Sequence, residues 1–243
     1  MNEASTPASR LAALQSRIDE ACRAAGRTAD QITLLAVGKT FPMESILQMA
    51  VLGQRRFGEN YVQEALAKIS ACRLERPDLN LEWHFIGPIQ SNKTRPIAEN
   101  FDWVHSVDRE KIARRLSEQR PAGLAPLQVC LQVNIGDEES KSGCEPGEAP
   151  GLAKAIAAMP GLRLRGLMAI PKPQTDVAAQ RRQFAMLRAI FEDIRAAGLA
   201  LDTLSMGMSD DLEAAVAEGA TMIRVGSALF GRRQANAPLA GAA

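Results

Sequence analysis

The chain has 243 residues, of which 46% are hydrophobic, and its formal net charge is +1. That length suits one domain with a sizeable core, and the near-neutral charge gives no electrostatic footprint for nucleic acid or an anionic membrane. The start lacks a signal-peptide pattern and no apolar stretch approaches the roughly 20 residues that span a bilayer, so we expect a cytoplasmic protein with small-molecule partners.

The first predicted element is an amphipathic helix near the N-terminus. Leu11, Leu14 and Ile18 recur at helical spacing, and Gly26 follows where helices commonly end. A short apolar run at 32–37 then predicts the first strand, and Pro42 suits the first turn of the next helix.

The same alternation of strand and helix repeats along the chain. Further strands are predicted at residues 55–58, 82–86, 103–106, 127–134, 164–169, 201–205 and 222–225. Further helices are predicted from about residue 61, near 93, from 109, after 146, through 184–194, from 210 and at 227–230. Eight apolar strands alternating with helices predict a single (β/α)8 TIM barrel over residues 1–234, with an extra N-terminal helix; an open doubly wound sheet is the alternative. The Ala-rich tail at 235–243 is expected to be disordered.

The residues that bind metals or form disulfides are few. The chain has four cysteines and two histidines. Its cysteines are scattered and form no C-x-x-C pair, which predicts reduced thiols. We therefore expect no metal site.

Polar residues and glycines gather just past the predicted ends of the strands, at the rim that builds the ligand site in this fold. They are Lys39, Asn60, Gly87, Ser106, Asn134, Met168, Ser205, Gly207 and Gly226. The opposite ends of the strands show no comparable gathering. The sequence therefore predicts a ligand site at this rim.

Lys39 leaves the first predicted strand in the segment Ala-Val-Gly-Lys-Thr. Partial desolvation there increases the fraction of neutral amine that attacks carbonyls, so Lys39 is a candidate for Schiff-base formation. From position alone, a solvated lysine is the commoner outcome. A nucleotide P-loop is excluded because its first glycine is absent upstream.

Two segments, 205–211 and 224–231, follow the seventh and eighth predicted strands, where TIM barrels often bind phosphate. Gly207 and Gly226 allow close backbone approach, and Ser205 and Ser227 offer hydroxyl donors. In either segment alone an ordinary turn is the simpler interpretation. The two together predict a phosphate cup.

Arg224 and Asn60 each have two interpretations. Arg224 is predicted inside the eighth strand, where its charge must be paired or must face a ligand. An ion pair with a barrel carboxylate such as Glu59 is as plausible as a ligand contact. Asn60 either hydrogen-bonds a ring hydroxyl of a ligand or caps the following helix, and capping is the commoner use.

The sequence resembles the pyridoxal 5′-phosphate (PLP) homeostasis family, PLP-binding proteins related to the N-terminal barrel of alanine racemase. The matching segments are 37–40, 57–64, 83–93, 105–108, 131–143, 166–171, 205–211 and 224–231. The resemblance implies that Lys39 holds PLP as a Schiff base, with the phosphate on Ser205, Gly226 and Ser227. It also implies that Arg224 faces the pyridine nitrogen. The implied role is intracellular PLP supply, with apo forms of PLP-dependent enzymes as acceptors.

Two other functions remain open: an amino-acid racemase and a barrel for another phosphorylated metabolite. Arg224 can only donate hydrogen bonds, which weakens the electron sink that PLP catalysis needs. Racemisation also needs an opposing acid, and Tyr61 is the single tyrosine, with no second domain expected. We therefore expect a monomeric PLP carrier without catalytic residues. Lys141 is predicted to be a solvated lysine, with a transient PLP contact as the alternative.

Overall fold

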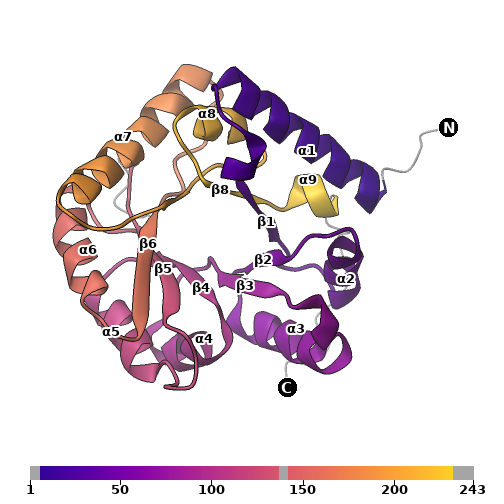
Figure 1. The fold of residues 1–243 in the computed structure, drawn as a ribbon, viewed down its shortest axis with the longest axis horizontal. Helices are drawn as coiled ribbons and strands as arrows, with labels where there is room; N and C mark the ends of the chain where they lie inside the picture. The colour runs from indigo at the N-terminus through magenta and orange to yellow at the C-terminus, as the bar shows by residue number, and fades with distance from the viewer. Residues whose placement is uncertain (1–5, 137–141, 232–243) are drawn as a thin grey trace.

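A computed structural model describes residues 6–136 and 142–231. In this part of the chain, eight parallel strands form a closed barrel in which each strand pairs with the next and β8 pairs with β1. The helices surround the barrel on the outside (Figure 1). The predicted (β/α)8 barrel is confirmed, and the open sheet is excluded because β1 and β8 pair with each other and close the sheet.

The elements follow one another in the predicted order. The strands are β1 (Thr33–Val37), β2 (Arg56–Glu59), β3 (Glu82–Phe85), β4 (Trp103–Val107), β5 (Leu127–Gln132), β6 (Leu162–Met168), β7 (Thr203–Ser205) and β8 (Met222–Val225). The α-helices of the described residues are α1 (Pro7–Ala24), α2 (Met43–Val51), α3 (Val62–Glu75), α4 (Thr94–Asn100), α5 (Glu110–Gln119), α6 (Ala149–Ala157), α7 (Val177–Ala196), α8 (Leu212–Ala217) and α9 (Ser227–Phe230). Short 3-10 helices lie at η1 (Ala29–Gln31), η2 (Pro77–Leu79), η3 (Ser91–Lys93) and η4 (Pro146–Glu148).

The extra helix α1 begins and ends where local chemistry requires. The Thr6 hydroxyl accepts the backbone N–H of Ser9, and Pro7 occupies the first turn, where no N–H partner is needed. Past the end of the helix, Gly26 adopts a φ of 67°, which glycine tolerates without strain. The apolar face of α1 packs against α8 and α9 on the outside of the barrel (Figure 1).

Some residues expected just past the strands lie inside them. Ser106 belongs to β4, and Met168 and Ser205 end β6 and β7, where they pair with each other. Side chains in a barrel strand alternate between the interior and the helices. The last residue of a paired strand therefore directs its side chain either into the barrel or toward the helices. Such a side chain does not project from the rim into solvent.

None of the helices in residues 6–136 and 142–231 combines the length and the apolar character needed to cross a bilayer. The predicted disordered tail at 235–243 lies outside the described residues.

Candidate functional site

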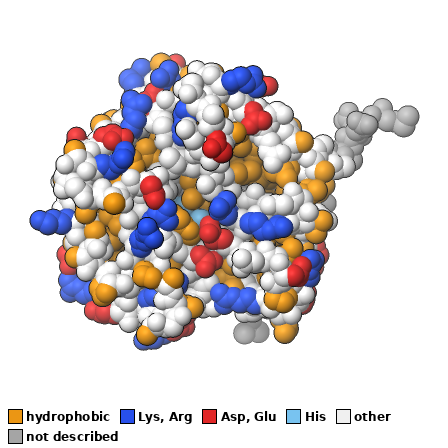
Figure 2. Space-filling model, in the orientation of Figure 1, with side chains coloured by type: hydrophobic (Ala, Val, Ile, Leu, Met, Phe, Trp, Pro, Cys, Tyr) orange, Lys and Arg blue, Asp and Glu red, His pale blue; other side chains and the backbone are white. Residues whose placement is uncertain are grey.

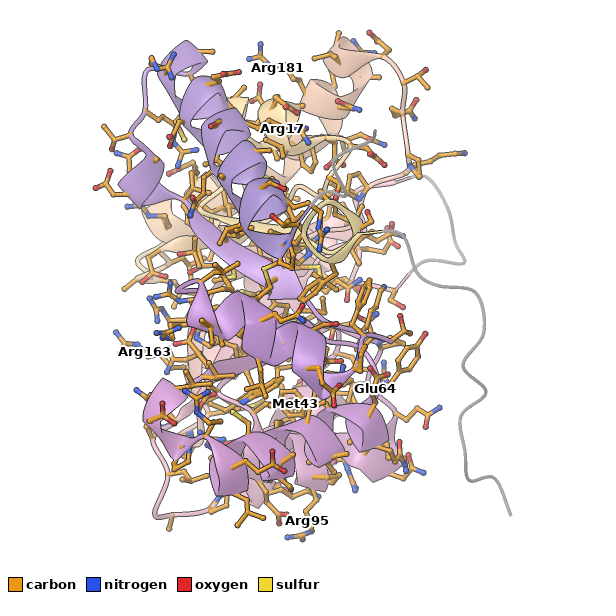
Figure 3. All side chains as sticks on the ribbon, turned by 90° about the vertical axis from the view of Figure 1, so that its right-hand side faces the viewer. Arg17, Met43, Glu64, Arg95, Arg163 and Arg181 are labelled. Atoms are coloured by element: carbon orange, nitrogen blue, oxygen red, sulfur yellow. The ribbon has the colours of Figure 1, made fainter. Side chains whose placement is uncertain are left out.

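The register of the closed sheet brings the predicted site residues to one rim. Ala36 of β1 lies opposite Val225 of β8, so the segments that follow these strands, with Lys39 and Gly226, are neighbours. Asn60 follows β2, on the other side of β1. Figure 3 shows Glu64 at this end of the barrel and Arg163 at the opposite end.

A buried lysine that the sequence did not single out holds the segment around Lys39. Lys68 of α3 donates to the Gly38 carbonyl at 2.9 Å, to Glu59 Oε1 at 2.8 Å and to Glu64 Oε1 at 2.6 Å. Glu64 Oε1 also accepts the backbone N–H of Thr40 at 2.6 Å. The backbone is therefore fixed on both sides of Lys39. The pairing of Glu64 with Lys68 at i,i+4 was the sequence signal for this arrangement.

Glu59 is the acidic group beneath the lysine segment. Its side chain is fully buried, and this burial raises the pKa of its carboxyl to about 7, against the opposing effect of the Lys68 ammonium. The charge of Lys39 also lowers the pKa of Glu59, so the two groups lie within electrostatic reach of each other. Oε2 of Glu59 has no hydrogen-bond partner among the described residues. The ion pair between Glu59 and Lys68 also excludes the predicted alternative in which Glu59 neutralises Arg224.

Asn60 does not cap the following helix. The N-cap position of α3 is Tyr61, and no side chain there bonds the first-turn amides. Asn60 Oδ1 is instead buried, without a hydrogen-bond partner in the described part of the chain. The capping interpretation was therefore wrong, because the chain turns into α3 one residue later than expected. A buried acceptor without a partner is unfavourable unless a ligand donor meets it.

Arg224 crosses the barrel interior. Its guanidinium donates to Ser205 Oγ and to the Ala169 carbonyl, both at 2.9 Å, and the residue is only 4% exposed. Burial lowers the pKa of Arg224 to about 10, so it stays charged at neutral pH. Within the described residues it forms no salt bridge. A buried charge with two neutral partners and N–H groups to spare favours an electron-rich ligand.

Ser205 is placed differently from the prediction. Its hydroxyl lies inside the barrel, where His105 Nδ1 is 2.8 Å away and Arg224 donates to it. A direct hydroxyl bond from Ser205 to a phosphate would have to replace these contacts. The predicted phosphate contact was based on the place of Ser205 at the end of the seventh predicted strand. That place fixes the position of the residue along the barrel but not the direction of its side chain.

Backbone groups dominate the rest of the predicted phosphate cup. Gly226 and Ser227 open α9, and the N–H groups of these two residues have no acceptor in the described structure. A Cβ atom on Gly226 would lie 3.2 Å from the Val37 carbonyl, so glycine keeps this turn close to β1. Gly207 has a φ of 95°, and a Cβ there would lie 2.6 Å from Ala215 Cβ. Gly207 is thus required by the packing of the loop on α8.

Comparison with known proteins shows the family. The model of the alanine racemase N-terminal domain matches residues 10–234. The pyridoxal phosphate homeostasis protein of Pseudomonas aeruginosa is 60% identical over 234 residues, which cover 96% of this chain and 99% of the relative. The chain belongs to the pyridoxal phosphate homeostasis protein family. The family member of Escherichia coli is 51% identical over 223 residues, with 92% of this chain and 95% of the relative covered.

Solved structures agree with this assignment. PipY of Synechococcus elongatus, solved with PLP bound, matches with a TM-score of 0.80 at 37% identity, over 93% of this chain and 100% of PipY. Alanine racemase of Corynebacterium glutamicum, at 19% identity and a TM-score of 0.63 over 96% of this chain and 63% of the racemase, shares the fold. The family predicted from the sequence segments is confirmed.

Three further features of the sequence are Lys141, the expected absence of a metal site and the two histidines. Lys141 lies outside the described residues, so its predicted role stays a prediction. Among the residues described, no group of three or more His, Cys, Asp and Glu side chains is arranged to hold a metal ion. Both histidines are buried in the barrel. From the sequence we assigned them no role, because two histidines are too few for a histidine-rich metal site.

Proposed function

We propose that this chain binds PLP at the rim described above and acts in PLP homeostasis, with Lys39 as the covalent attachment point. PLP supplies an aldehyde that a lysine amine captures reversibly. The observation that carries the proposal is a set of polar groups at the C-terminal end of the barrel whose hydrogen-bonding capacity the described residues leave partly unused. They include an acceptor on Asn60, N–H groups on Arg224 and the amides that open α9.

These groups match the polar atoms of PLP. The Arg224 guanidinium suits an aromatic nitrogen that only accepts, and Asn60 Oδ1 suits a ring hydroxyl. The amides of Gly226 and Ser227 suit a phosphate, with the Ser227 hydroxyl as a further donor and Gly207 in the neighbouring loop. We propose that Ser205 contributes from inside the barrel, by orienting Arg224.

We further propose that the protein carries PLP without efficient turnover, as a cytoplasmic monomer that supplies apo forms of PLP-dependent enzymes. Arg224 stays charged and only donates, which works against a protonated ring nitrogen. Tyr61 is the single tyrosine and is 56% exposed, and its hydroxyl makes no hydrogen bond within the described residues. The names of the relatives do not favour a racemase.

The phosphate cup predicts a difference between PLP and pyridoxal, which lacks the phosphate. Each charge-assisted hydrogen bond to the phosphate contributes on the order of 1.5–3 kcal/mol, so pyridoxal should bind much more weakly than PLP. Ser227→Ala should weaken PLP binding and leave pyridoxal binding unchanged. Ser205→Ala should weaken both ligands alike, because it acts through Arg224. Binding titrations followed by absorbance test this, and equal affinity of the wild type for the two ligands contradicts the cup.

The carrier proposal predicts no sustained inversion of amino acids. The PLP-loaded protein is incubated with L-alanine, L-serine and L-glutamate in deuterated buffer, and chirality and deuterium content are followed together. Lys39 offers one base, so label can enter slowly while configuration is kept. Inversion at a typical enzymatic rate of about 1 to 1,000 per second would instead establish a racemase.

A further inference from the structure

A continuous chain of hydrogen bonds runs through the barrel interior and ends on Arg224. Glu82 Oε1 lies 2.8 Å from His84 Nε2, and His84 Nδ1 lies 2.8 Å from His105 Nε2. His105 Nδ1 lies 2.8 Å from Ser205 Oγ, which accepts from Arg224 at 2.9 Å. These five residues, which we call the axial relay, include both histidines of the protein.

The axial relay has one arrangement of protons. The Glu82 carboxylate can only accept, so a neutral His84 carries its proton on Nε2 and accepts at Nδ1. His105 must then donate from Nε2 and accept at Nδ1, and the Ser205 hydroxyl donates to it. Arg224 can only donate to Ser205. All four hydrogen bonds therefore point in the same direction, from the guanidinium toward the carboxylate, which favours mutual polarisation.

The environment keeps both imidazoles neutral and in place. His84 and His105 are fully buried, and burial lowers the pKa of each. The titratable groups that influence the pKa of His84 are Glu82, Asp102 and Arg56, and those that influence the pKa of His105 are His84 and Arg224. His84 also stacks on Trp103, with ring centroids 5.4 Å apart and planes 11° apart. Rotation of the His84 ring out of line would break this stack.

The far end of the axial relay opens on a cavity. This basal cavity of about 760 Å³ lies at the N-terminal ends of the strands and is lined by Glu82, Arg56, Asp102 and Trp103 among others. Figure 2 shows that end of the barrel, with acidic and basic side chains around a central hollow and a histidine at its floor. Glu82 is 37% exposed there and is paired with Arg56 at 3.2 Å. Its charge is thus accessible to solvent ions and ligands.

We propose that the axial relay couples the charge of Glu82 in the basal cavity to the orientation of Arg224 at the opposite rim, with His84 and His105 as positioning residues. The proposal rests on the proposed function for its effect on PLP, while the relay itself is a property of the protein alone. Coupling of this kind is reciprocal: a cation or protonation that neutralises Glu82 weakens ligand binding, and a bound ligand alters Glu82.

The first test needs no ligand and no variant. The protein, freed of any histidine tag, is labelled with ¹⁵N at its two imidazoles, which give four ring nitrogens in the NMR spectrum. Near neutral pH, we expect one protonated and one unprotonated nitrogen in each ring, with both protons on Nε2. A proton on Nδ1 of either ring, or an imidazolium, overturns the relay.

The second test removes the charge of Glu82 and measures the effect on His105 and on ligand binding. Glu82→Gln should shift the His105 nitrogens, although residue 82 contacts only His84 of the two rings. It should also weaken PLP and pyridoxal binding by the same factor, at least about fivefold, which is the lower end of typical coupling between sites. Asp102→Asn is the matched control, because it removes a carboxylate from the same cavity outside the axial relay.

The outcomes of the second test separate the two proposals. Equal effects of Glu82→Gln and Asp102→Asn on the His105 nitrogens indicate through-space electrostatics and overturn the coupling. A His105 shift without any change in affinity for PLP and pyridoxal overturns the coupling to the ligand. If the wild type binds no PLP at all, the proposed function fails, and the relay is still judged by its imidazole signals.

Discussion

Lys39→Ala is expected to abolish covalent attachment of PLP, from one label per chain to none. Lys39 follows β1 at the rim, between two backbone groups that Lys68 and Glu64 hold in place. A lysine on a fixed backbone can present its amine to an aldehyde from a constant position, which a lysine on a mobile surface cannot. Arg224 and the amides that open α9 are unchanged in the variant, so weaker noncovalent binding of PLP should persist.

The measurement is borohydride reduction of the PLP-loaded protein, followed by peptide mass mapping. Lys154→Ala is the control, because Lys154 is an exposed lysine on α6, and this variant should keep the full label on Lys39. A label that stays stoichiometric in Lys39→Ala, or that maps to another lysine in the wild type, would contradict the assignment.

Lys68→Met is expected to lower the free energy of unfolding by about 3–5 kcal/mol, the usual effect of removing one partner of a buried ion pair. Lys68 is 6% exposed and Glu59 is fully buried, so the variant leaves a carboxylate without its ammonium. The Gly38 carbonyl and Glu64 also lose their donor. We therefore expect slower attachment of PLP to Lys39 as well, because the backbone before it is released.

The loss of stability in Lys68→Met should depend on pH. The folded-state pKa of Glu59, about 7, lies above the ordinary value of 4.5, so folding favours the protonated carboxyl. This contribution is fully present below the unfolded pKa and is lost as the pH rises through the folded pKa. Without the ammonium, the folded pKa rises further and the loss continues to higher pH. The difference from wild type should therefore be larger at about pH 8 than at about pH 5.

Urea unfolding at the two pH values measures both effects. The control is the double variant Lys68→Met with Glu59→Gln, in which no carboxylate is left at residue 59. We expect it to be more stable than Lys68→Met at about pH 8, and its difference from wild type to vary less with pH. The buried ion pair would be contradicted if Lys68→Met were as stable as wild type, or if its difference from wild type were larger at about pH 5 than at about pH 8.

The order of the elements and the family could both be predicted from the sequence alone. Apolar runs of strand length alternate with helical periodicity along the whole chain, and these local patterns survive folding because each strand is buried between the helices and the barrel interior. Lys39 and Gly226 were placed at the same rim, since parallel strands end at one edge of the sheet. Arg224 was expected in the interior, because it lies within a strand that is apolar on either side.

Which polar groups meet inside the barrel could not be predicted from the sequence, because it depends on how the sheet closes. Glu59 pairs with Lys68 of α3 rather than with Arg224, and the Ser205 hydroxyl faces His105, 100 residues earlier in the chain. Alternation along a strand indicates which side chains point inward, but not which of them share a layer. That depends on the stagger of the closed sheet, which is set by all eight strand pairings together. For this reason the axial relay follows from the register of the barrel and not from any local motif.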